Sequence, residues 1–191
     1  MSEPAYRRLD VDERRAQLLE LGTELFTKHA YDELSMAAIA REAGISKALL
    51  YHYFPSKEEY FKATLADAVA DLVARTQPPA DLAPVEELRH RTRAFVEWVG
   101  ERRESYVKLL QSAGSVPEVG ELITNIRDVT SRRILEGLLP KRGRTPRARA
   151  AVRGWLWFMD GVLLDWIEHG DREADEVADS LIDSLTALLP G

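Results

Sequence analysis

Residues 36–55 are MAAIAREAGISKALLYHYFP, and this stretch decides how the N-terminal part of the chain folds. Ser35 can cap a short helix that Gly44 ends, and Ser46 can cap a second helix that must stop before Pro55. Two short helices that cross steeply need apolar contacts, a small residue at the crossing and a turn residue that tolerates positive φ. The sequence supplies all three, with Ile39, Ala43, Ile45 and Leu50 as contacts, Ala40 at the crossing and Gly44 in the turn. We therefore predict a helix-turn-helix unit whose second helix covers about residues 46–54.

Helical spacing of apolar residues continues along almost the whole chain, without convincing strand alternation. We expect helices over about 12–29, 36–43, 46–54, 56–75, 84–102, 104–113, 115–139, 145–169 and 173–189. The segment Gln77-Pro-Pro-Ala is the clearest break. The predicted fold class is all-α, with an N-terminal three-helix helix-turn-helix domain over residues 1–65 and a C-terminal helical bundle over residues 66–191.

The composition is that of an ordinary globular protein. The 191 residues are 45% hydrophobic, include no cysteine and give a formal net charge of -6. The N-terminus is polar, without the apolar core of a signal peptide. The longest apolar-rich run, residues 155–167, is too short to span a bilayer and includes two aspartates. We expect a cytoplasmic protein that does not enter a membrane.

The patterns expected of enzymes and metal proteins are missing from the sequence. The four histidines, His29, His52, His90 and His169, are scattered without the spacing of metal ligands. Neither a glycine-rich phosphate loop nor a G-x-S-x-G turn occurs. We expect no cofactor, no metal and no catalytic activity.

The acidic balance argues against general affinity for nucleic acid, so DNA could be bound only through a concentrated local patch. In a helix-turn-helix unit the second helix lies in the major groove, with its N-terminal residues facing base edges. Lys47 can reach guanine acceptors or a phosphate, and Ala48 and Leu49 can contact thymine methyl groups. The candidate DNA-binding residues are Ser35, Ser46, Lys47, Ala48, Leu49, Tyr51, His52, Tyr53 and Lys57. The alternative is that both lysines are ordinary solvated side chains.

A basic N-terminal arm could add contacts to DNA. Arg7, Arg8, Arg14 and Arg15 could reach a neighbouring groove. The alternative for Arg7 and Arg8 is a solvated tail.

The stretch LLELGTELFTKHAYDELSMAAIAREAGISKALLYHYFPSKEEYFKATL, residues 18–65, resembles the DNA-binding domain of the TetR family of transcriptional regulators. The shared features are the His-Ala-Tyr turn, LSMAAIA, AGIS, LYHYF and SKEEYF. The resemblance implies a homodimeric repressor of palindromic double-stranded operator DNA, released by a small-molecule inducer in the C-terminal bundle. Two departures are Ala30, where glycine is more frequent, and Leu49, where threonine or serine is common. Because Leu49 cannot donate a hydrogen bond, the operator cannot be inferred from a relative.

Residues 150–170, AAVRGWLWFMDGVLLDWIEHG, are apolar nearly all round a helix, which must then be covered on both sides. One side of this helix can pack against its own bundle, and the other side can pack against a partner subunit. A second apolar stripe, on the last helix, would belong to the same subunit interface. The candidate dimer interface comprises Gly154, Trp157, Gly161, Leu164, Val177, Leu181, Leu185 and Leu188. The alternative is that both stripes belong to the core of a single chain.

Aromatic and sulfur side chains with isolated polar groups favour a small-molecule pocket. The candidate ligand-binding residues are Trp98, Tyr106, Leu110, Asn125, Ile126, Trp155, Phe158, Met159 and Asp160. Each could instead pack in the core, and Asp160 could pair with an arginine. The sequence thus predicts a ligand-responsive DNA-binding repressor. The alternatives are a regulator without an inducer and a helical binding protein that has lost DNA binding.

Overall fold

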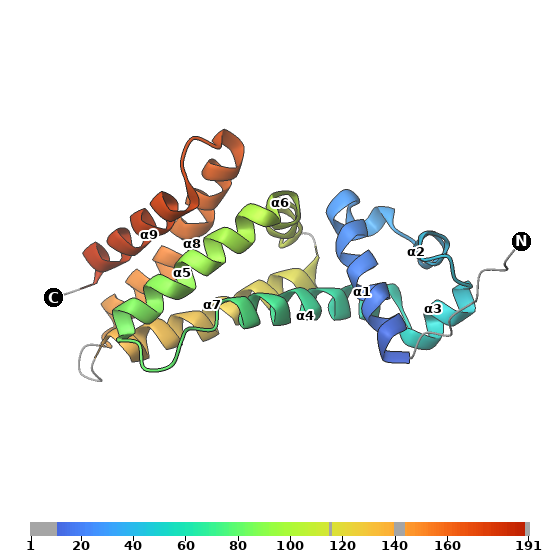
Figure 1. Cartoon of the computed structure of the whole chain (residues 1–191), viewed down its shortest axis with the longest axis horizontal. Helices are drawn as coiled ribbons and strands as arrows, with labels where there is room; N and C mark the ends of the chain where they lie inside the picture. The colour runs from blue at the N-terminus through green and yellow to red at the C-terminus, as the bar shows by residue number, and fades with distance from the viewer. Residues whose placement is uncertain (1–10, 115, 140–143, 190–191) are drawn as a thin grey trace, which may run out of the picture. The chain divides into compact units, whose positions relative to one another are not determined.

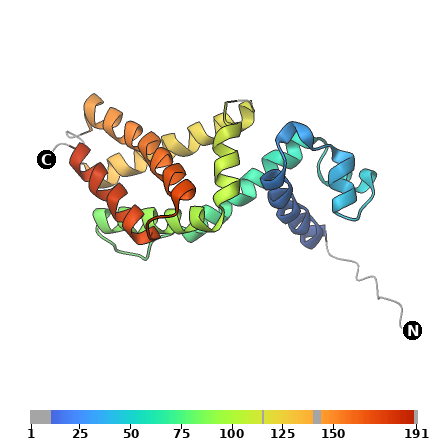
Figure 2. The same ribbon diagram turned by 90° about the horizontal axis from the view of Figure 1, so that it is seen from above.

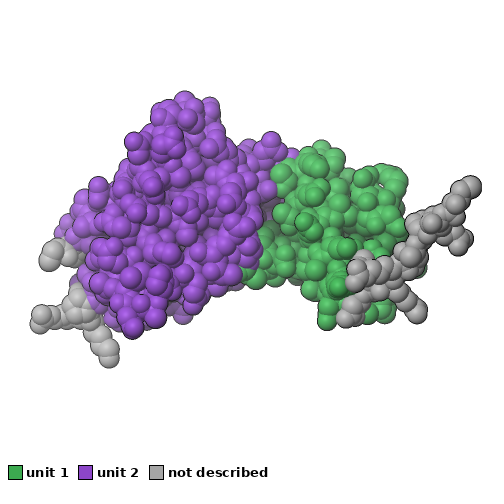
Figure 3. All heavy atoms as spheres, in the orientation of Figure 1, with its two compact units in different colours: residues 1–70 green, residues 71–191 purple. Residues whose placement is uncertain are grey.

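The computed structural model describes residues 11–114, 116–139 and 144–189. These residues form nine α-helices, one 3-10 helix and no strand, which confirms the all-α class (Figure 1). The chain divides into two compact units, residues 1–70 and 71–191 (Figure 3). The division falls inside helix α4 (Lys57–Arg75), as does the predicted boundary after residue 65.

The first unit packs α1 (Val11–Lys28), a 3-10 turn η1 (Tyr31–Glu33), α2 (Met36–Glu42), α3 (Lys47–Tyr53) and the first part of α4 around one core. Tyr60 is fully buried there, and its hydroxyl donates to the Leu18 carbonyl at 2.5 Å. Burial raises the pKa of Tyr60, so it remains a proton donor. At Gly22 an added Cβ would lie 2.4 Å from Oγ1 of Thr64, so α1 and α4 approach each other too closely for a side chain at this position.

The second unit contains the end of α4, α5 (Pro84–Glu101), α6 (Arg103–Ser112), α7 (Pro117–Leu138), α8 (Pro146–His169) and α9 (Ala174–Leu188). α5 packs against α9, α7 against α8, and α8 against α9 (Figure 2). Helices α5, α7 and α8 each begin with proline. Proline suits the first position of a helix because the backbone N–H that it lacks would have no partner within the helix there. Gly170, at φ +62°, ends α8 in the left-handed conformation. No helix among the described residues is long and apolar enough to cross a membrane.

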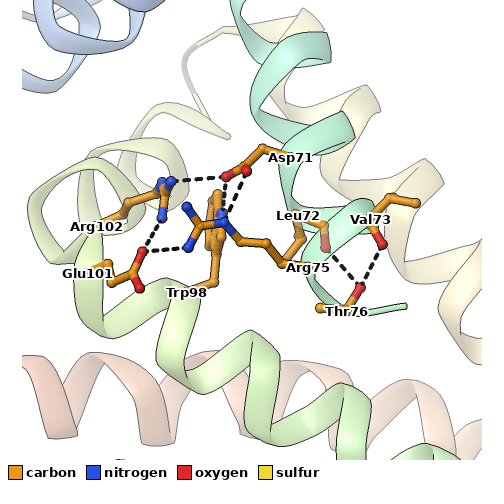
Figure 4. Close-up of polar contacts among 8 residues, drawn as sticks. All are labelled: Asp71, Leu72, Val73, Arg75, Thr76, Trp98, Glu101 and Arg102. Atoms are coloured by element: carbon orange, nitrogen blue, oxygen red, sulfur yellow. Dashed lines mark hydrogen bonds and ion pairs between the residues drawn. The ribbon is translucent and has the colours of Figure 1, made fainter. Parts of the chain in front are cut away.

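A ring of polar contacts fastens the end of α4 to the end of α5 (Figure 4). The Asp71 carboxylate accepts hydrogen bonds from Trp98 Nε1 at 3.0 Å, Arg102 at 2.9 Å and Arg75 Nε at 3.0 Å. Both arginines also donate to Glu101, at 2.7 and 2.8 Å. Burial by itself would raise the pKa of Asp71, but these hydrogen bonds and the arginine charges lower it. Trp98, predicted as a ligand contact, is therefore a buried member of this ring.

Candidate DNA-binding site

The helix-turn-helix forms through the local bonds that its sequence predicts. The Ser35 hydroxyl accepts the Ala38 amide at 3.1 Å, and the Ser46 hydroxyl accepts the Leu49 amide at 3.1 Å. Gly44 has φ +64°, and its added Cβ would meet nothing within 4 Å. Glycine is therefore favoured at this position by backbone conformation and not by lack of space.

Burial separates the two sides of α3. Leu50 and Phe54 are almost completely buried in the core of the first unit, which fixes the helix to its module. On the opposite side, residues 46–49 are all exposed. Leu49 is 37% exposed and Tyr51 is 41% exposed, so both side chains are accessible from solvent. The leading end of α3 is thus free of its own core and accessible to a partner.

Two lysines lie beside tyrosine rings in this unit. Lys47 Nζ is 5.6 Å from the centre of the Tyr51 ring, and both side chains are exposed. Lys57 Nζ is 4.1 Å from the Tyr31 ring and donates to the Tyr31 carbonyl at 3.0 Å. An ammonium group has three donors, and the Tyr31 carbonyl uses one of them. Lys57 is therefore an oriented cation at the start of α4 and not a freely solvated lysine.

The remaining candidates in the unit differ in accessibility. Ser35 and His52 are exposed, whereas Tyr53 is half-buried and packs against the core. Arg15 lies over the Phe54 ring at 5.6 Å, while Arg7 and Arg8 lie outside the described residues. Tyr31 was not predicted from the sequence as a residue of this site. Its signal would have been an aromatic residue in the turn that precedes the Ser35 cap.

A helix-turn-helix with an exposed leading end, joined to a separate helical bundle, defines the class of sequence-reading DNA-binding proteins. The family model "Bacterial regulatory proteins, tetR family" matches residues 18–64. A second model, "Tetracyclin repressor-like, C-terminal domain", matches residues 84–188. The chain belongs to the TetR family of bacterial regulatory proteins. Regulators of this family bind DNA as dimers.

Similar proteins and structures agree with this assignment. The HTH-type transcriptional activator FasR of Mycolicibacterium smegmatis is 41% identical over 90 residues, covering 47% of this chain and 40% of FasR. The regulator HbdR of an Aromatoleum species is 30% identical over 129 residues, or 66% of this chain and 56% of HbdR. The chain thus spans about half the length of these relatives or less. A TetR-family regulator from Streptomyces coelicolor has a TM-score of 0.79 at 28% identity, covering 94% of this chain and 82% of that one. A TetR-like regulator from Rhodococcus sp. RHA1 has a TM-score of 0.72 at 27% identity, covering 94% and 97%.

The predicted dimer interface separates into two groups. Val177, Leu181 and Leu185 are fully buried by the chain's own helices and leave no surface for a partner. Their assignment to the interface is wrong, because α9 turns this stripe inward against α5 and α8. The other predicted residues are exposed, with Trp157 at 63%. These exposed residues are Gly154, Trp157, Gly161, Leu164 and Leu188.

The predicted ligand-binding residues do not gather at one place. Trp155 is buried, and its indole donates to the Leu181 carbonyl at 2.8 Å and to Ser184 at 3.0 Å, which gives it a structural role. Leu110 and Met159 pack against the same core, and Tyr106 lies within it. Phe158 is 49% exposed on α8, and its role in ligand binding stays a prediction. Ile126 is half-buried.

Only Asn125 and Asp160 remain as polar candidates for ligand binding. Asn125 lies in an open depression of about 500 Å³, which is lined also by Pro117, Gly120, Glu121 and Thr124. Asp160 forms an ion pair with Arg127 and accepts a hydrogen bond from Tyr106 at 2.7 Å. The alternative expectation, that Asp160 pairs with an arginine, is confirmed. Arg127 was not singled out from the sequence.

Proposed function

We propose that this chain represses transcription by binding a palindromic operator as a homodimer, and that a small hydrophobic ligand in the bundle releases it. The observation that supports the proposal most directly is the exposed leading end of α3, at Ser46–Leu49, on a helix anchored through Leu50. That arrangement suits insertion into a major groove about 12 Å wide. The acidic net charge then favours specific sites over non-specific residence on DNA.

Each exposed group on this side has a role that suits its chemistry. Lys47, near the start of α3, contacts a guanine edge or an adjacent phosphate. Ala48 and Leu49 provide apolar contact with thymine methyl groups. Lys57, already oriented by Tyr31, uses its remaining donors for a phosphate. The Ser35 end of α2 and Tyr51 supply further backbone contacts.

The homodimer is supported by the exposed stripe on α8. Gly154, Trp157, Gly161 and Leu164 recur at intervals of three and four residues, so they share one side of the helix. A stripe of exposed aromatic, aliphatic and glycine positions is typical of a helix that packs against another subunit. Binding to a palindromic operator requires the α3 helices of the two copies to lie about 34 Å apart, one turn of B-form DNA.

Release by a ligand would follow from a population shift. A ligand that binds better when the two α3 helices are misplaced weakens operator binding, and DNA weakens ligand binding by the same factor. A second candidate function is a regulator of the same family that binds no inducer at these aromatic residues. It is favoured because Trp98, Tyr106 and Trp155 are buried by the chain's own side chains and hydrogen bonds.

Selection of genomic fragments bound by the purified chain, followed by sequencing, tests the proposal. We expect an enriched motif with two inverted half-sites about one helical turn apart. A gel shift on that motif should show a complex that contains two copies of the chain. The DNA-binding proposal fails if no fragment is bound at low salt, and the homodimer fails if the motif is a single half-site bound by one copy.

A further inference from the structure

Trp157 lies on the surface of α8 with an arginine beneath it. The guanidinium carbon of Arg127, on α7, is 3.8 Å from the centre of the indole ring. Although Trp157 is 63% exposed, the Arg127 side chain is only 16% exposed. One face of the indole is therefore covered from inside the bundle, while much of the rest faces solvent. An exposed tryptophan that is already stacked loses little conformational entropy on contact with a partner.

Arg127 is itself held from the interior. Its guanidinium donates to one carboxylate oxygen of Asp160, and the other oxygen accepts the Tyr106 hydroxyl at 2.7 Å. The Asp160 side chain is 14% exposed, and Tyr106 lies in the core. Burial, and then the adjacent carboxylate, raise the pKa of Tyr106, so its hydroxyl keeps its proton and continues to donate. The four residues thus form a chain of contacts from α6 through α8 and α7 to the exposed indole.

The surface around Trp157 fits a second copy of this chain. Gly154 and Gly161 lie on the same stripe, and an added Cβ at either position would meet nothing within 4 Å, so the space above them is open to another helix. Beside the stripe, Arg153 and Asp128 form an exposed ion pair at 2.6 Å. Both charge signs are therefore present at this edge, so a two-fold contact can pair them between copies without like-charge repulsion.

We propose that Trp157 anchors the contact between two copies, and that Arg127, fixed by Asp160 and Tyr106, is the positioning residue that holds the indole in its binding orientation. This inference rests on the proposed homodimer and specifies which side chain dominates it. Tryptophan is one of the three residue types most enriched among those that dominate interface energies. Exclusion of water on association strengthens the attraction between the guanidinium and the ring.

Sedimentation equilibrium of the full chain and three variants tests the proposal. Trp157→Ala should raise the dimer dissociation constant by about 100-fold, as expected for a dominant interface residue. Asp160→Asn keeps the acceptor for Tyr106 but removes the charge that holds Arg127, and should raise the constant by about tenfold. Asp179→Asn is the matched control, because Asp179 pairs with Arg89 and Arg93 of α5, at 2.9 and 3.0 Å, and not with Arg127.

A second measurement separates positioning from general stability. Emission of Trp157 in the parent and in each aspartate variant is taken as the difference between the spectra of that protein with and without Trp157→Phe, recorded at dilutions where the chain is monomeric. In Asp160→Asn the indole should be more accessible to acrylamide, whereas in Asp179→Asn it should match the parent. Equal weakening of self-association in the two aspartate variants, or unchanged quenching in Asp160→Asn, overturns the positioning role.

Different results would overturn the role of Trp157 as anchor and the proposed function of the chain. A Trp157→Ala chain that dimerises with the parent's affinity overturns the anchor, and if it also binds the selected operator, the proposed function stands with a different interface. A parent chain that stays monomeric on the operator overturns the homodimer of the proposed function itself.

Discussion

Gly44→Ala tests whether the turn between α2 and α3 determines operator binding. Gly44 has φ +64°, and its added Cβ would meet nothing within 4 Å, so the substitution introduces backbone strain without a clash. A residue with a Cβ in the left-handed region costs about 1–2 kcal/mol, partly offset by about 0.4–1 kcal/mol of lost unfolded-state entropy. The net destabilisation of the first unit should be about 1 kcal/mol.

The same strain limits the loss of DNA affinity. If the variant relaxes its turn, α3 moves, and the chain must restore the strained turn to bind the operator. The affinity can then fall by no more than the strain itself, about 5- to 30-fold for 1–2 kcal/mol. Hydrogen exchange of the buried α3 amides measures the destabilisation, with exchange through unfolding expected to be about fivefold faster. A gel shift on the selected operator measures the affinity.

Two controls make this prediction refutable. Gly170→Ala introduces the same strain at φ +62°, also without a neighbour within 4 Å, but at the end of α8 in the other unit. It should destabilise the second unit and leave the intrinsic affinity of the folded dimer for DNA unchanged. Gly44→Asn should recover most of the loss, because asparagine tolerates the left-handed region. The reasoning is refuted if Asn is as harmful as Ala, or if Ala changes neither exchange nor affinity.

Three further predictions concern charged residues. Lys57→Ala should lower the magnitude of the salt slope of operator binding by about one, whereas Lys28→Ala, on the exposed pair with Glu24, should leave the slope unchanged. Lys47→Ala should reduce discrimination at one position of each half-site by about 1–3 kcal/mol, and equal loss on all sequences would make it a backbone contact. Asp71 has a lowered pKa in the folded chain, so its stabilisation is present above the unfolded pKa of about 3.9 and is lost as the pH falls through the folded value. The difference between the urea midpoints of Asp71→Asn and the parent should therefore be largest near pH 7 and should shrink as the pH is lowered below the unfolded pKa of about 3.9. A difference that stays constant as the pH falls would contradict this.

The sequence by itself determined the helices and the turn between α2 and α3. Every expected helix is present, and most ends agree within a residue or two. These features depend on bonds between neighbours in the chain, such as Ser46 with the Leu49 amide, and on the conformational freedom of Gly44. Such interactions extend over only a few residues, so residue type and spacing are sufficient to predict them.

Only the tertiary structure decided which sides of these helices are buried and which charges meet. The α8 sequence is apolar nearly all round, and nothing in it distinguishes the buried Trp155 from the exposed Trp157. The stripe of α9 could have faced a partner, but packing against α5 and α8 buries it. Arg127 meets Asp160 across 33 positions of sequence, and Lys57 meets Tyr31 across 26. Such pairings depend on how helices distant in sequence pack together, and the periodicity of each helix does not specify its neighbours.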